Sequence, residues 1–347
     1  KVLNEKFTRR ERTARMIFQY IKKSILLTIT PFCLLQIFSA CQRNDSTIKL
    51  IEWSSVDSID VKAINSDLEP GKQTIDVGIY FPENLDPDFE KVTLNQVMAS
   101  FLSAKEIYSP THVQINLLWV KTGNIDPRFL SFQANKIPEV PQTEYVNMYK
   151  HMQRNPSILT QKAFEAFMSI IEPAPDNHRT IYLVILQDVF FPFFDVSEGR
   201  NWMIKTVRTG GLSFPSYSYC NTMPDNLRGV ITLTNLSRPD RLRKTIAHEI
   251  GHKAINVSHE YRDLDPQHEI YEAGGLMIYG DGEKIPSGEK GRWHLERLKL
   301  SPFIYYLDKN GTKKWNEDYK EGGHYYDPIY GNYAVNFRGS VEIDEDW

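Results

Sequence analysis

The 347-residue sequence has little cysteine, no long apolar run and no excess of basic charge. A membrane-spanning helix needs about 20 consecutive apolar residues, and no stretch of the chain provides them. The formal net charge is −3, although residues 1–40 hold eight Lys or Arg against two Glu, so the rest of the chain is more acidic than the whole. An acidic chain does not indicate a nucleic-acid partner. The hydrophobic content of 41% and charged content of 24% are those of an ordinary globular protein.

The N-terminal residues 1–40 have the layout of a signal peptide. Met16 is followed by Lys22 and Lys23 and then by an apolar run over residues 25–38, and residues 1–15 lie upstream of it. The segment Phe38-Ser39-Ala40-Cys41 resembles a bacterial lipobox, in which the chain is cut before a lipid-bearing cysteine. That resemblance implies a lipid anchor on Cys41 and a place in the bacterial cell envelope, at the outer membrane, in the periplasm or at the surface. A plain signal peptide cut near Ala40, or a retained anchor, is the alternative.

The cysteine count excludes an internal disulfide framework on this interpretation. Cys33 would be removed with the signal peptide and Cys41 would carry lipid, which leaves Cys220 alone in the folded part. We predict that residues 41–72 form a lipid-anchored tether. Residues 73–347 then form the folded domain, with an N-terminal subdomain at 73–256 and a C-terminal subdomain at 257–347.

The pattern of apolar residues from position 73 onward predicts an α+β fold with an N-terminal mixed, twisted sheet. Period-two alternation and apolar runs predict strands at 75–79, 113–120, 180–187 and 229–234, with an edge segment at 210–215. Helical spacing predicts helices at 93–109, 144–152 and 160–171, and residues 121–142 indicate a loop. Ser237 begins one more helix, and the chain beyond Lys299 is expected to form an irregular C-terminal lobe.

That last helix carries the segment His248-Glu249-Ile250-Gly251-His252. Two His four residues apart on a helix project from one face, about one turn apart, and can bind one metal ion. Glu249 beside them can take a proton from a zinc-bound water. The segment therefore predicts a catalytic Zn²⁺ site with His248 and His252 as ligands and Glu249 as general base. A solvated helix with two incidental His is the alternative.

The residues after this segment resemble the metzincin clan of zinc endopeptidases, whose signature is HExxHxxGxxH followed by a Met-turn. Ile255 stands where that family has Gly, Ser258 where it has the third His, and His259 lies one residue later. Asn256 can end the helix in the left-handed conformation, and its spacing to His259 matches the family's spacing from Gly to His. His259 is our expected third ligand. The other candidates are Glu272, which would complete the site as in the gluzincin group, and Glu260, Asp263 or His268.

The resemblance also assigns the segment Gly274-Gly275-Leu276-Met277-Ile278-Tyr279-Gly280. It implies that Met277 forms the Met-turn beneath the ligands and that Tyr279, two residues later, supports the oxyanion; an ordinary core Met and a packed or surface Tyr are the alternatives. The implied activity is zinc-dependent hydrolysis of protein or peptide substrates outside the cytoplasm. The rivals are a gluzincin-like peptidase that uses Glu272 and a catalytically inactive surface binding protein on the same fold.

Overall fold

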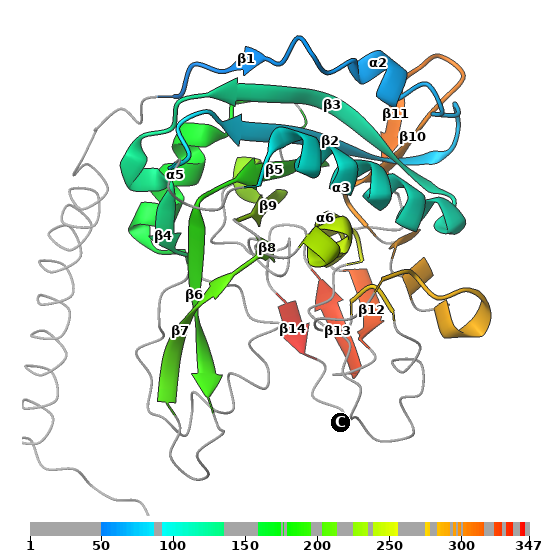
Figure 1. The fold of residues 1–347 in the computed structure, drawn as a ribbon. Coiled ribbons are helices and arrows are strands. Elements are labelled where there is room, and N and C mark those ends of the chain that lie inside the picture. Colours follow the sequence, from blue (N-terminus) through cyan, green and yellow to red (C-terminus); the bar gives the residue numbers. More distant parts are fainter. Residues whose placement is uncertain are drawn as a thin grey trace, which may run out of the picture. The chain divides into compact units, whose positions relative to one another are not determined.

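A computed structural model describes the chain in segments that cover most of the predicted domain (Figure 1). The described residues are 50–86, 92–134, 159–174, 176, 179–195, 203–213, 225–234, 239–255, 275–277, 283–291, 294–295, 298–299, 301–315, 323–327, 331–335 and 341–343. None of the helices among them is both long and apolar enough to cross a membrane. The predicted helix at 144–152, the signal peptide and the lipobox lie outside these residues.

The fold is α+β, built on a mixed sheet whose strands follow the order β1-β3-β2-β5-β9-β8, with β10 on β2 and β11 on β10. The strands are β1 (Ser54–Ser55), β2 (Gln73–Pro82), β3 (Val113–Gly123), β5 (Ile181–Ile185), β8 (Gly211–Ser213), β9 (Val230–Leu233), β10 (Ile304–Leu307) and β11 (Lys313–Trp315). The central strands β2, β3, β5 and β9 are parallel, whereas β8 runs antiparallel to β9. Nearly every residue of β2 and β5 is buried, which is typical of strands covered on both faces.

Three helices of eight or more residues accompany the sheet among the described segments, namely α3 (Leu94–Tyr108), α5 (Gln161–Ile170) and α6 (Pro239–Ala254). Thr93 and Gln96 form a capping box that starts α3, and the Thr160 side chain caps α5. After α3 the chain turns through the 3₁₀ segment Ser109–Thr111, where Pro110 cannot continue the helix. The predicted helix positions 93–109 and 160–171 are therefore confirmed.

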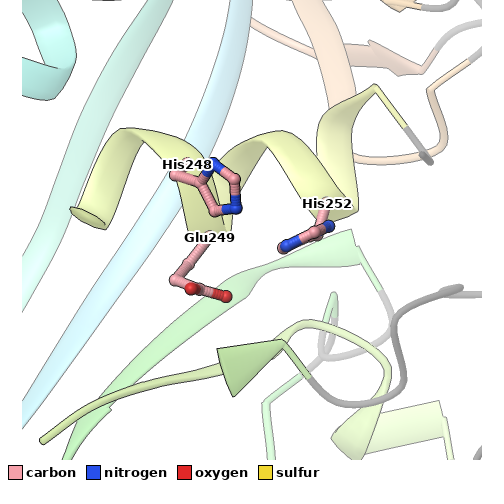
Figure 2. A group of neighbouring side chains, drawn as sticks. All are labelled: His248, Glu249 and His252. Carbon is pink, nitrogen blue, oxygen red and sulfur yellow. The ribbon is translucent and has the colours of Figure 1, made fainter. Parts of the chain in front are cut away.

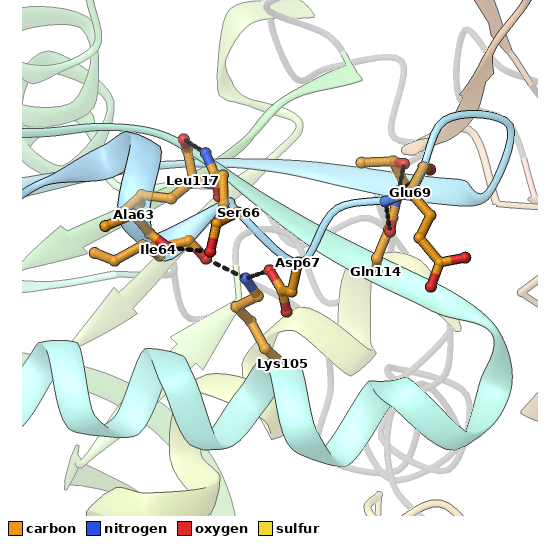
Figure 3. A network of polar contacts seen from close by, with 10 residues as sticks. Ala63, Ile64, Ser66, Asp67, Glu69, Lys105, Gln114 and Leu117 are labelled. Atoms are coloured by element: carbon orange, nitrogen blue, oxygen red, sulfur yellow. Dashed lines mark hydrogen bonds and ion pairs between the residues drawn. The ribbon is translucent and has the colours of Figure 1, made fainter.

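Residues 50–72, which we predicted as part of a tether, lie against the sheet. β1 pairs with β3, and the short helix α2 (Val61–Ile64) is followed by a network of polar contacts with β3 and α3 (Figure 3). Asn65 exchanges two hydrogen bonds with the backbone of Leu117, and the Lys105 ammonium donates to the Ile64 carbonyl and to Asp67. The folded part of the chain thus begins before Gln73.

Other segments of the chain form two smaller, three-stranded sheets. The first joins β4 (Ser131–Gln133), β6 (Asp188–Asp195) and β7 (Met203–Thr209), and the second joins β12 (Gly323–Asp327), β13 (Gly331–Val335) and β14 (Val341–Ile343). The loop predicted at 121–142 therefore contains the end of β3 and all of β4. The prediction of an irregular lobe beyond Lys299 is also wrong, because β10 to β14 in that part of the chain are strands.

The sequence predicts a boundary between two subdomains at residue 256. The β10–β11 hairpin comes after that boundary, yet β10 pairs with β2. Asp76 on β2 is fully buried and accepts hydrogen bonds from the Tyr305 hydroxyl at 2.6 Å and from Asn116 at 2.8 Å. Its other oxygen forms an ion pair with Lys313 at 2.6 Å. The C-terminal part of the chain therefore completes the N-terminal sheet.

Candidate metal centre

The helix α6 brings three potential metal ligands together, namely His248, Glu249 and His252 (Figure 2). One ligand atom from each of them lies within 4.8 Å of the other two. The two imidazole rings are 4.7 Å apart at their centroids and stand nearly perpendicular to each other, at 89°. The i, i+4 spacing therefore produces the shared face that the sequence predicts.

His248 is oriented by a contact that the sequence motif does not reveal. Its Nδ1 lies 2.8 Å from the Leu276 carbonyl oxygen, which can only accept, so Nδ1 carries the hydrogen and donates. In the neutral ring Nε2 then carries no hydrogen, which is the state that a metal ligand requires. Burial lowers the pKa of His248, and the nearby Lys244 lowers it further against the opposing effect of the Leu276 bond. The ring is therefore in its metal-binding form at neutral pH.

Glu249 is a buried carboxyl group, only 5% exposed. Its Oε2 has no hydrogen-bond partner among the described residues. Burial raises the pKa of Glu249 to about 8, and the charge of the buried Lys253 partly opposes this rise. A buried carboxylate without a partner is costly, and binding of a cation beside it would lower that cost.

Two glycines allow close packing around the ligands. A Cβ at Gly211, on the edge strand β8, would lie 2.6 Å from the Glu249 Oε1, and a Cβ at Gly251 would lie 2.3 Å from the Met277 Sδ. Both distances are shorter than real side chains tolerate, so these positions require glycine unless a neighbour moves. The fully buried Met277 therefore lies directly against α6, in the turn of the helix between His248 and His252.

The helix α3 holds α6 in place. The fully buried Tyr108 donates its hydroxyl hydrogen to the Ala247 carbonyl at 3.1 Å, and the Ser100 hydroxyl donates to the Leu242 carbonyl. Both acceptors belong to the α6 backbone on the N-terminal side of the ligands. Ile246 and Ile250 of α6 are fully buried in the hydrophobic core.

The strand β8 is the last strand of the large sheet among the described residues. The Thr234 amide donates to the Gly210 carbonyl at 2.9 Å, and in an antiparallel pair the residues that bond to the partner alternate. The backbone groups of Leu212 therefore face β9, whereas those of Gly211 and Ser213 face away from it, and the Gly211 carbonyl accepts a hydrogen bond from the Thr209 hydroxyl. An extended peptide can add to such an edge by backbone hydrogen bonds.

The structure thus brings together His248, Glu249 and His252, and it places Met277 against Gly251 of the same helix. The expected ligand His259, the possible oxyanion residue Tyr279 and the lipidation site Cys41 lie outside the described residues. The same holds for Glu272, Glu260, Asp263 and His268. Sequence reasoning did not identify the Leu276 carbonyl or Gly211 as parts of the site; the glycine pair 210–211 was the one signal, and it predicted only an edge segment.

The donor set fits a zinc ion, because imidazole nitrogen and carboxylate oxygen are among its usual ligands in proteins. The Nδ1–H tautomer of His248, and the buried Oε2 of Glu249 that has no hydrogen-bond partner among the described residues, support that fit. No protein-family model matches the sequence, and no match to a curated protein was found. The case for function therefore depends on the site itself.

Proposed function

We propose that the protein is a zinc-dependent endopeptidase that acts on protein or peptide substrates outside the cytoplasm. One observation carries the proposal: two His and a buried Glu, whose Oε2 has no hydrogen-bond partner in the described part of the chain, lie on one helix beside the edge strand of the sheet. Two metal-binding His residues alone would suit many reactions. An adjoining strand edge favours an extended polypeptide as the substrate.

In this proposal His248 and His252 hold the metal, and a bound zinc ion supplies an activated water and polarises the scissile carbonyl. Glu249 accepts the water proton and returns it to the leaving amine. Its contact with Gly211 keeps the carboxyl group next to the edge on which the substrate would lie. The Leu276 carbonyl holds the His248 ring in its tautomer.

The remaining ligand is also a proposal. We assign it to His259, with Glu272 as the alternative, and we assign oxyanion support to Tyr279 by the resemblance to metzincins. Met277 would form the Met-turn, and its position against Gly251 supports that role. His259→Ala should then lower zinc occupancy far more than Glu272→Ala, and the reverse order would identify a gluzincin-like site.

The test uses the full chain loaded with zinc. We expect about one zinc per chain, lost in His248→Ala or His252→Ala, because either change leaves too few strong ligands. Glu249→Ala should keep the zinc and the thermal unfolding transition but lose cleavage of an unfolded protein such as β-casein. Equal zinc content in both His variants and the parent would refute the metal site. Equal cleavage by Glu249→Ala and the parent would refute the mechanism.

A surface binding protein without turnover is the second candidate, favoured by Ser258 at the position where metzincins have their third His. It would bind β-casein in the parent and in Glu249→Ala alike, and neither form would cut it.

We also propose a lipid anchor at Cys41. One acyl chain binds a membrane only marginally, whereas several chains hold a protein firmly. Cys41→Ser should therefore move the protein out of the membrane fraction or stall its processing. A variant that stays membrane-bound and is cut to the same size as the parent would exclude the anchor.

A further inference from the structure

The strands β6 and β7 form a two-stranded ribbon, here called the β6–β7 ribbon (Asp188–Asp195 and Met203–Thr209; Figure 1). β4 pairs only with the first three residues of β6, so from Phe191 onward β6 pairs with β7 alone among the described strands. Between its two Asp, β6 reads Val-Phe-Phe-Pro-Phe-Phe. Successive strand residues belong to opposite faces, so both faces of the ribbon carry apolar residues. A lone hairpin cannot bury two apolar faces by itself.

One face of the β6–β7 ribbon leads to the candidate metal centre. Phe191 and Val207 are partners across the two strands, and both are half-buried. Val189 and Thr209 form the next pair on the same face. The Thr209 hydroxyl donates to the Gly211 carbonyl, and Gly211 lies against the Glu249 carboxyl group. The apolar face is therefore continuous with the strand edge beside Glu249.

The distance from Val207 to Gly211 is no longer than a short stretch of extended peptide. Val207 precedes Gly211 by four residues, which corresponds to at most about 13 Å of strand. A substrate chain that lies along β8 with its scissile bond beside Glu249 would therefore reach Phe191 and Val207 within about four of its own residues.

We propose that this face of the β6–β7 ribbon binds an apolar stretch of the substrate, about four residues from the bond that is cut. The inference rests on the proposed endopeptidase function and specifies its substrate class: extended polypeptides with a large apolar side chain at that spacing. The binding surface consists of Phe191 and Val207, with Val189 and Thr209 at its base. Burial of apolar side chains on the ribbon would supply the affinity, and the edge of β8 would supply the register.

The test compares the zinc-loaded parent with Phe191→Thr/Val207→Thr, because threonine retains β-propensity and removes apolar surface. Leu307→Thr is the matched control, since Leu307 is a 37%-exposed apolar residue on β10, in the other hairpin. Mass spectrometry of β-casein digests should show large apolar residues enriched three to five positions from the cuts made by the parent and the control. The double variant should lose this enrichment and cut about tenfold more slowly, with zinc content unchanged. The same enrichment in all three proteins would overturn the proposal.

Binding tests the β6–β7 ribbon separately from catalysis. In the Glu249→Ala background, the ribbon substitutions should raise the Kd for fluorescently labelled β-casein about tenfold, and Leu307→Thr should leave it unchanged. If the parent cuts nothing while this difference persists, the proposed function fails and the binding surface stands. An unchanged Kd overturns the surface. The proposal would also be overturned if the ribbon substitutions abolished binding to phosphatidylcholine–phosphatidylglycerol vesicles and left casein binding intact. The ribbon would then contact a membrane and not the substrate.

Discussion

At Glu249, burial opposes ionisation and so links the stability of the metal-free protein to pH. The pKa of this carboxyl rises from an ordinary 4.5 to about 8 on folding, mainly because burial disfavours the charged form. Between these two values the unfolded chain has released the proton, whereas the folded chain still holds it. The stability that Glu249 contributes is therefore fully present below about pH 4.5 and lost as the pH rises to about 8.

Glu249→Gln should consequently change the pH dependence of stability. The amide cannot ionise, so the metal-free variant should gain stability relative to the parent between pH 5 and pH 8. Urea unfolding in the presence of a chelator measures this difference at both pH values. Glu106→Gln is the control, since that side chain is 73% exposed. A difference between parent and Glu249→Gln that is the same at both pH values would contradict the burial argument.

At the scale of elements, the packing of β8 against α6 places Glu249 beside the sheet edge. A methyl group at Gly211 would lie 2.6 Å from the Glu249 Oε1, so Gly211→Ala must displace the carboxyl group or the strand. A misplacement of about 1 Å can cost up to about a hundredfold in rate. We expect cleavage of β-casein to fall at least tenfold with zinc content retained.

Thr206→Ala, on β7, is the control, because Thr206 is exposed and the change brings no new atom towards Glu249. Cleavage should then stay within about twofold of the parent. If Gly211→Ala cleaves casein as fast as the parent, the close approach of β8 to Glu249 has no role in the reaction.

The elements that sequence reasoning predicted correctly are those with a local signal. Thr93 with Gln96, and the apolar run of β5, each mark a helix start or a strand within a few residues. The ribbon strand β6 was missed because Phe residues at consecutive positions show no alternation of apolar and polar residues. The strands beyond Lys299 were missed because pairing partners such as Ile304 and Ile75 lie far apart in the chain.

The same distinction holds for the candidate site. The i, i+4 pair of His248 and His252 is a local signal, and the prediction that the two side chains lie on one face of a helix is confirmed. The Leu276 carbonyl and Gly211 reach the site from separate segments, and a backbone carbonyl has no signature in a sequence.

At the scale of the molecule, the ion pair between Lys313 and the fully buried Asp76 connects the late hairpin β10–β11 to the early strand β2. Lys313→Met would leave a buried carboxylate without its cation, which should lower the free energy of unfolding by about 3 kcal/mol. Chemical denaturation measures the change.

Asp76→Asn combined with Lys313→Met should recover part of this loss, because the buried charge is then removed. Lys314→Met should have little effect, since that lysine is 51% exposed and lies 3.8 Å from Asp308. If Lys313→Met lowers the free energy of unfolding no more than Lys314→Met does, the ion pair does not stabilise the hairpin on β2.

The docking of the β10–β11 hairpin on β2 also determines when the large sheet can be completed during synthesis of the chain. Tyr305 and its acceptor Asp76 are 229 residues apart, and ribosomes add about 5–20 residues per second. The large sheet therefore stays open for roughly 10 to 45 seconds after β2 has been made. The helix with the candidate ligands emerges during this interval, on a scaffold that still lacks two strands. The large sheet is therefore completed only after the segment that carries His248, Glu249 and His252 has been synthesised.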